Sequence, residues 1–233
     1  MSQQSLTETQ QRLLDTGKVL LVGKHSEEIP EGERDVILRG FAGNFGNKGL
    51  ACTTLRDDGI VLIVTEGDVE TSILRHEFIH AAQCNVSIET MQSALDAVIT
   101  VGEPLVAAIR ERMRAIPECR NDHRDLEVTE RQWDMQVNGT SVLDAFVSFQ
   151  FFQDLYPTKE TTSIAYEAIG LGYKHGVYAA MSAYLAFERG FTIDPLSDLA
   201  RELVAYTFEQ LNHEIIDEMM EEACRSFENT VRM

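Results

Sequence analysis

The stretch RHEFIHAAQ, from Arg75 to Gln83, contains a His-Glu-x-x-His pattern. On an α-helix, His76 and His80 would lie one turn apart on nearly the same face. Two imidazoles placed in this way can bind one Zn²⁺, at about 2.0–2.1 Å each. Glu77 would project beside them, close enough to accept a proton from water but badly placed to be a ligand alongside both histidines. The pattern predicts a zinc hydrolase site with His76 and His80 as metal ligands and Glu77 as the catalytic general base.

The alternative for so short a pattern is a helix whose two histidines face solvent or a polar cleft by chance. Two features of the context favour the metal site. The motif follows a predicted β-hairpin directly, and apolar residues such as Phe78 and Ile79 surround the polar ones. The histidines would therefore face an interior cleft rather than bulk water.

HEFIH resembles the active-site helix of the zincin metallopeptidases. HEFIHAAQ is similar in particular to the HExxHxxQ variant found in small bacterial and phage proteins. The resemblance covers this motif and one downstream segment. It implies a zincin-like fold, a Zn²⁺ cofactor, peptide or protein substrates and a mechanism in which water attacks the peptide bond.

A catalytic zinc site needs a third protein ligand and an open coordination position. The metzincin pattern would place another histidine soon after the motif, following a glycine, but Ala81–Asn85 contains neither. The third ligand must therefore come from farther along the chain. A glutamate on a later helix is the gluzincin solution.

Two glutamates fit that expectation by resemblance. Glu202 begins the segment ELVAY, which resembles the Glu-x-x-Ala-Tyr segment that accompanies HExxHxxQ, although Val204 replaces a second glutamate of the fuller pattern. Glu167 begins EAI, which thermolysin-like enzymes share, but the flanking Asn and Ser-Asp are missing. We predict Glu202 as the third ligand and keep Glu167 as the alternative.

Other residues with metal-binding or catalytic side chains are assigned simpler roles. A His76, His80 and Cys84 triple would spread one ion's ligands over roughly 12 Å of helical rise, which is too long. His213 starts a similar pattern that ends in Asp217, and we interpret it as part of an acidic amphipathic helix. Tyr206, one turn after Glu202, is more often a core residue than an oxyanion donor.

Strand signals are confined to the first part of the chain. Residues 50–55 and 60–65 flank an Asp-Gly turn, which is typical of a hairpin, and further strands are predicted at 18–22 and 35–39. Asp68 is a predicted helix N-cap. Proline positions help to separate the predicted helices, which cover 5–17, 69–84, 87–101, 103–116, 124–136, 141–155, 161–189 and 197–227.

This order predicts an α+β fold in which a small N-terminal sheet precedes a large helical part. No linker interrupts the chain, so we expect a single zincin-like domain over 1–233, with a strand-rich part at 1–66 and a helical part at 67–233. Residues 60–65 would form an edge strand that aligns a peptide substrate beside the active-site helix.

Composition limits the partners. The 233 residues carry 20 basic and 38 acidic side chains, for a formal net charge of −18. Such a charge disfavours nucleic acid and anionic membranes as partners, because both attract positive surfaces. The sequence contains neither a bilayer-spanning apolar run nor an N-terminal secretory pattern, and its four cysteines form no CxxC pair. We expect free thiols and an intracellular location, cytoplasmic or within a virion.

The sequence therefore predicts a zinc-dependent metallopeptidase. Its rival is a non-enzymatic helical protein, such as a virion or assembly component, that carries a structural or degenerate metal site. An open, water-accessible coordination position would distinguish the enzyme from a closed four-ligand site.

Overall fold

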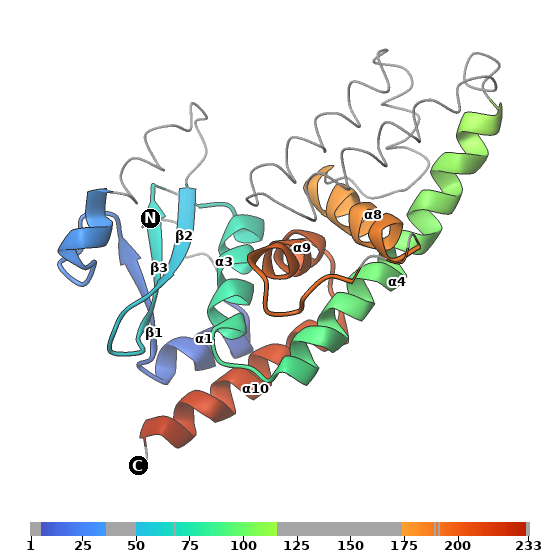
Figure 1. The fold of residues 1–233 in the computed structure, drawn as a ribbon. Helices are drawn as coiled ribbons and strands as arrows, with labels where there is room; N and C mark the ends of the chain where they lie inside the picture. The colour runs from blue at the N-terminus through green and yellow to red at the C-terminus, as the bar shows by residue number, and fades with distance from the viewer. Residues whose placement is uncertain are drawn as a thin grey trace. The chain divides into compact units, whose positions relative to one another are not determined.

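The computed structural model describes residues 6–35, 50–67, 69–115, 174–188, 190 and 192–231. The chain divides into two compact units, one formed by Met1–Met91 with Phe208–Met233 and the other by Gln92–Thr207. A small sheet and a majority of helices confirm the α+β class (Figure 1). The described elements are α1 (Glu8–Asp15), β1 (Val19–Gly23), β2 (Leu50–Leu55), β3 (Val61–Glu66), α3 (Thr71–Gln83), α4 (Ile88–Ala115), α8 (Lys174–Glu188), α9 (Asp198–Phe208) and α10 (Glu214–Val231).

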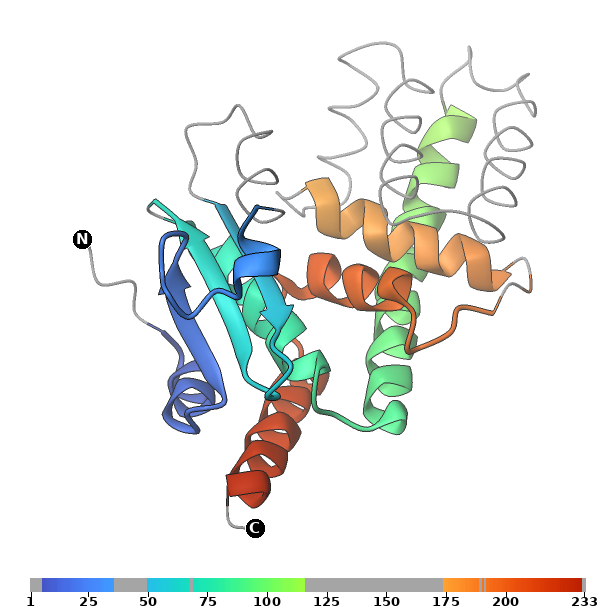
Figure 2. The same ribbon diagram turned by 60° about the vertical axis from the view of Figure 1, so that its left-hand side comes forward.

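The sheet of the first unit has the strand order β1-β3-β2 (Figure 2). β3 pairs with β1 in parallel, with Val19 opposite Val61, and with β2 in antiparallel, with Thr53 opposite Ile63. Residues 60–65 therefore do not form an edge strand, and that prediction was wrong. The hairpin signal is local, whereas the parallel pairing with β1 joins segments that are distant in sequence.

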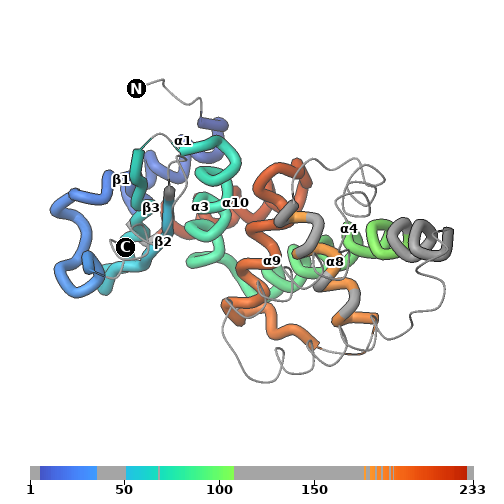
Figure 3. Tube along the Cα trace, turned by 90° about the horizontal axis from the view of Figure 1, so that it is seen from above, coloured from blue at the N-terminus to red at the C-terminus, as the bar shows by residue number. Residues whose placement is uncertain are grey.

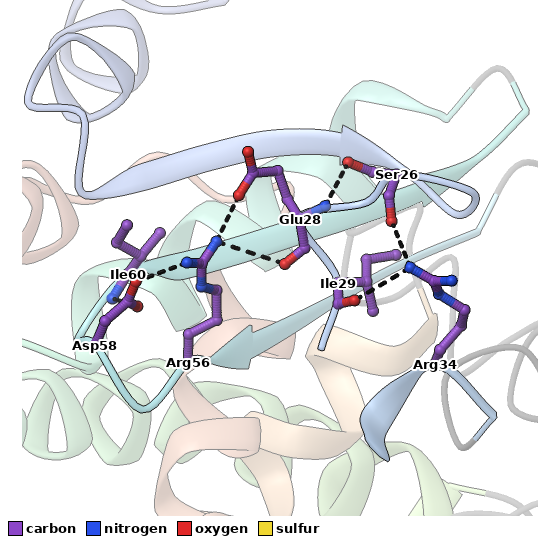
Figure 4. Close-up of polar contacts among 7 residues, drawn as sticks. All are labelled: Ser26, Glu28, Ile29, Arg34, Arg56, Asp58 and Ile60. Atoms are coloured by element: carbon purple, nitrogen blue, oxygen red, sulfur yellow. Dashed lines mark hydrogen bonds and ion pairs between the residues drawn. The ribbon is translucent and has the colours of Figure 1, made fainter. Parts of the chain in front are cut away.

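The turn between β2 and β3 confirms the predicted hairpin. Gly59 has a φ of 78°, a left-handed conformation that glycine adopts without strain. Asp58 accepts a hydrogen bond from the Ile60 amide at 3.2 Å, and Arg56 bridges Asp58 and Glu28 at 2.6 and 2.5 Å. Figure 4 shows these contacts, which tie the turn to the segment that follows β1.

Both faces of β3 are covered, since Val61, Leu62, Ile63 and Val64 are all fully buried. Leu62 and Val64 pack with Ile29 on one face. Val61 and Ile63 point to the other face, as the alternation of side chains along a strand requires. Helix α3 packs against β2 and β3, and α1 packs against β1.

Helix α1, near the start of the chain, packs against α10, the last described helix, in this unit (Figures 1 and 3). Thr7 and Gln10 form a reciprocal capping box at the start of α1. Arg12 then forms ion pairs with Glu221 at 2.6 Å and Glu228 at 3.0 Å on α10. α10 also packs against α3, so it supports the helix that carries the His-Glu-x-x-His motif.

Helix α4, most of which lies in the second unit, runs without interruption through Pro104. The two separate helices predicted at 87–101 and 103–116 are therefore one. A proline inside a helix removes one backbone hydrogen bond, but Leu105 and Val106 are buried directly after it. A Cβ on Gly102 would overlap the backbone carbonyl of Ala180 on α8, which shows how closely the two helices pack. This tertiary packing outweighs the tendency of Pro104 to end a helix.

The helix predicted at 197–227 is instead two helices, α9 and α10, separated by residues 209–213. No glycine or proline marks the break, which explains why the sequence pattern missed it. His213 precedes α10, and its Nδ1 accepts a hydrogen bond from the Ile215 amide at 3.2 Å. His213 therefore caps the helix rather than lying on it, in the way that side-chain acceptors satisfy the first amides of helices.

Several predictions lie outside the described residues. They are the strand at 35–39 beyond its first residue, the helices at 124–136 and 141–155, and most of the helix at 161–189. Among the described helices, none combines the length and hydropathy that crossing a bilayer requires.

Candidate metal centre

Helix α3 carries the motif through the interior of the first unit. Leu74, Phe78, Ile79 and the pair Ala81–Ala82 are buried in the core. The helix begins at Thr71 after an N-cap at Glu70, whose side chain makes no capping bond, so the predicted N-cap at Asp68 was wrong. Because almost the whole circumference of α3 is covered, its polar side chains must find partners inside the protein.

His76 and His80 face each other on this helix. Their Nε2 atoms are 3.0 Å apart, and their rings meet edge to face with centroids 4.7 Å apart and an interplanar angle of 74°. His76 is only 8% exposed. The predicted spacing of one helical turn thus places the two imidazole nitrogens close enough to share one cation.

The outer ring nitrogens of the two histidines lie against oxygen atoms. His80 Nδ1 is 2.9 Å from Oε1 of Gln83, three residues farther along α3. His76 Nδ1 is 3.3 Å from Oε2 of Glu209, an ion-pair contact at an angle outside that of a hydrogen bond. A metal-bound histidine usually has such an acceptor at its other nitrogen.

The donor set fits a zinc ion. If each Nδ1 carries the ring proton, the two Nε2 lone pairs point at each other, which is unfavourable unless a cation lies between them. A tetrahedral Zn²⁺ at about 2.0–2.1 Å from both nitrogens would hold them about 3.3 Å apart. The observed pair would need to open by only a few tenths of an ångström, roughly, for such an ion.

Glu77, the predicted general base, is buried, with 6% of its surface exposed. Thr53 on β2 contacts it twice through its hydroxyl, at 2.7 Å from Oε2 and at 3.1 Å from the backbone carbonyl. Burial, then the charges of Glu77 and Glu33, raise the pKa of the neighbouring Cys52 thiol to about 12. Glu77 is therefore held by the strand beside it, and its negative charge acts on the Cys52 thiol.

The predicted third ligand lies in the second unit. Glu202 is half-buried on α9, where the small Ala205 is fully buried and Tyr206 is half-buried. The role of Glu202 as a metal ligand stays a prediction. Glu167, the alternative, lies outside the described residues.

Sequence reasoning assigned no role at this centre to three residues, namely Thr53, Gln83 and Glu209. Gln83 could have been found, because seven residues after His76 it falls on the same helical stripe as the two histidines. Thr53 and Glu209 carried no such signal, since only the tertiary structure brings β2 and the segment after α9 to this helix.

No protein-family model, curated protein or solved structure matches this chain.

Proposed function

We propose that this protein is a zinc-dependent metallopeptidase of the gluzincin type with a zincin-like fold. One observation carries the proposal: the Nε2 atoms of His76 and His80 face each other at 3.0 Å, while an oxygen atom lies beside the Nδ1 atom of each ring. This arrangement suits a divalent cation bound by neutral imidazoles.

His76 and His80 would bind the metal through Nε2, and Glu202 is the third ligand that we propose from its resemblance to the gluzincin segment. Two imidazoles and one carboxylate form a set typical of catalytic zinc, which keeps one position open. Bound zinc supplies a Lewis acid that polarises a carbonyl and makes water acidic near neutral pH.

Glu77 would act as the general base and then as the general acid. Its carboxylate accepts a proton from the attacking water and returns that proton to the leaving amine when the peptide bond breaks. The Thr53 hydroxyl holds one carboxylate oxygen of Glu77 at 2.7 Å, which fixes the direction in which the base points.

The substrates that we propose are peptides or unfolded segments of proteins. Of the described strands, β2 pairs with β3 and carries Thr53, which contacts the proposed base. An extended substrate could pair with an outer strand through main-chain hydrogen bonds. The net charge of −18 disfavours nucleic acids and anionic membranes as partners.

The test is the Glu77→Gln variant, assayed for bound zinc and for hydrolysis of an unfolded protein and a fluorogenic peptide library. We expect zinc binding to be retained and hydrolysis to fall by about 10²–10⁴-fold, because the general base is lost while the ligands remain. Glu103→Gln, which changes an exposed carboxylate on α4, serves as the control and should retain full activity. Undiminished hydrolysis by Glu77→Gln would refute the proposed mechanism.

A further inference from the structure

Gln83 determines which nitrogen of His80 can carry the ring proton. Its side chain is 4% exposed, and its Oε1 lies 2.9 Å from His80 Nδ1. An amide oxygen accepts hydrogen bonds and cannot donate them. The contact therefore favours the tautomer in which Nδ1 of His80 is protonated and Nε2 presents a lone pair.

Glu209 lies beside Nδ1 of His76 as an ion-pair contact rather than a hydrogen bond, so it acts on this ring through its charge. Its carboxylate lies 3.3 Å from His76 Nδ1, and both side chains are nearly enclosed, at 11% and 10% exposure. A carboxylate is also an acceptor only, and its charge makes the ring more basic. Glu209 follows the last residue of α9 directly, in the segment that breaks the helix predicted at 197–227.

From these contacts we infer that Glu209 and Gln83 are positioning residues that favour a proton on Nδ1 of His76 and of His80 when a cation is bound, so that both Nε2 lone pairs point at that cation. The inference deepens the proposed function and rests on it for the identity of the cation. It also gives a role to the glutamine of HEFIHAAQ.

The two positioning residues should differ in how strongly each polarises the imidazole beside it. Glu209 carries a full negative charge beside His76, whereas Gln83 is neutral beside His80. A charged acceptor polarises the imidazole more strongly than an amide does. Loss of Glu209 should therefore weaken metal binding more than loss of Gln83.

The first test needs no metal. The full-length protein, labelled with ¹⁵N and freed of metal by a chelator, is studied by histidine side-chain NMR at pH 8, where an ordinary imidazole is neutral. Without metal we expect the Nδ1–H tautomer at His80, because its Nε2 then accepts the hydrogen bond of the 3.0 Å contact from Nε2 of His76. We also expect His80 to shift toward the Nε2–H tautomer in Gln83→Leu. The Nε2–H tautomer at His80 of the unmodified protein would overturn the inference.

Conservative variants separate the loss of an acceptor from a loss of folding. Gln83→Glu and Glu209→Gln both keep an acceptor oxygen. The first should preserve the Nδ1–H tautomer of His80, and the second should lose less zinc affinity than Glu209→Leu. Glu214→Leu changes an exposed carboxylate at the start of α10 and should change neither tautomer. If Gln83→Glu lost the tautomer as fully as Gln83→Leu, an acceptor role for Gln83 would be excluded.

The second test is zinc affinity, measured by competition with a chelator on the same variants. Glu209→Leu and Gln83→Leu should each bind zinc about 10–100-fold more weakly, the range typical for loss of an acceptor behind a ligand. Equal affinity in all variants would overturn the inference. If the unmodified protein bound no zinc, the proposed function would fail, and the tautomers alone would decide the inference.

Discussion

At the scale of single residues, the proposed metal centre combines four polar side chains on one buried helix. His76, Glu77, His80 and Gln83 lie on α3 among core residues. Burying so many polar groups is costly unless each has a partner. Thr53 contacts Glu77, Gln83 contacts His80, and Glu209 contacts His76. A protein that used this helix only for packing would gain more from apolar side chains at these positions.

Cys52 provides a probe of the charge on Glu77. Burial, then Glu77 and Glu33, raise the pKa of its thiol to about 12, from an unperturbed value of 9.0. We predict that Cys52 reacts with iodoacetamide at pH 8 about a thousandfold more slowly than an unperturbed thiol, because the thiolate is the reactive form. In the metal-free Glu77→Gln variant the reaction rate of Cys52 should rise, since the charge of Glu77 no longer raises the pKa of the thiol.

The rate is measured by mass spectrometry of the peptide that contains Cys52. Glu8→Gln, which changes an exposed carboxylate on α1, is the control and should leave the rate unchanged. A Cys52 thiol as reactive as free cysteine in the unmodified protein would mean that Glu77 and Cys52 do not share a buried environment.

At the scale of elements, β2 and α3 are joined by a hydrogen bond as well as by packing. The hydroxyl of Thr53 lies 2.7 Å from the Glu77 carboxylate. We predict that Thr53→Val lowers the free energy of unfolding by about 1–3 kcal/mol, because the buried carboxylate loses a donor. Thr53→Ser keeps the hydroxyl and should lose much less. Chemical denaturation measures both, and an equal loss in the two variants would contradict a role for the hydroxyl.

The close packing of α4 on α8 gives a prediction for the second unit. A Cβ on Gly102 would overlap the backbone carbonyl of Ala180, whereas a Cβ on Gly32 would meet no atom within 4 Å. Gly102→Ala should therefore destabilise the protein by about 1–3 kcal/mol through overpacking. Gly32→Ala, the matched control, should be neutral or slightly stabilising. Thermal unfolding compares them, and an equally harmless Gly102→Ala would show that the two helices do not pack this closely.

Local sequence signals predicted the elements that local physics determines. The Asp-Gly turn identified the hairpin, and the polar and apolar spacing around His76 identified α3. Non-local packing determined the rest. Helix α4 continues through Pro104 because it packs closely against α8. Strand β3 is central because β1 pairs with it. Glu209 reaches His76 only because the chain breaks between α9 and α10.

At the scale of the whole molecule, the chain divides its predicted site residues between two compact units. The motif helix, Thr53 and Glu209 belong to the first unit, together with the sheet and both ends of the chain. The predicted third ligand, Glu202, belongs to the second. The single domain expected from the sequence stays a prediction, and so does the ligand role of Glu202.

The central claim is that His76 and His80 bind zinc, and the most direct measurement is the metal content of the purified, untagged protein after exposure to zinc and removal of the excess. We predict about one zinc per chain, as in mononuclear catalytic sites, with loss of the metal in His76→Ala and, if Glu202 is the third ligand, in Glu202→Ala. An unmodified protein without zinc, or zinc content unchanged by His76→Ala, would contradict the account.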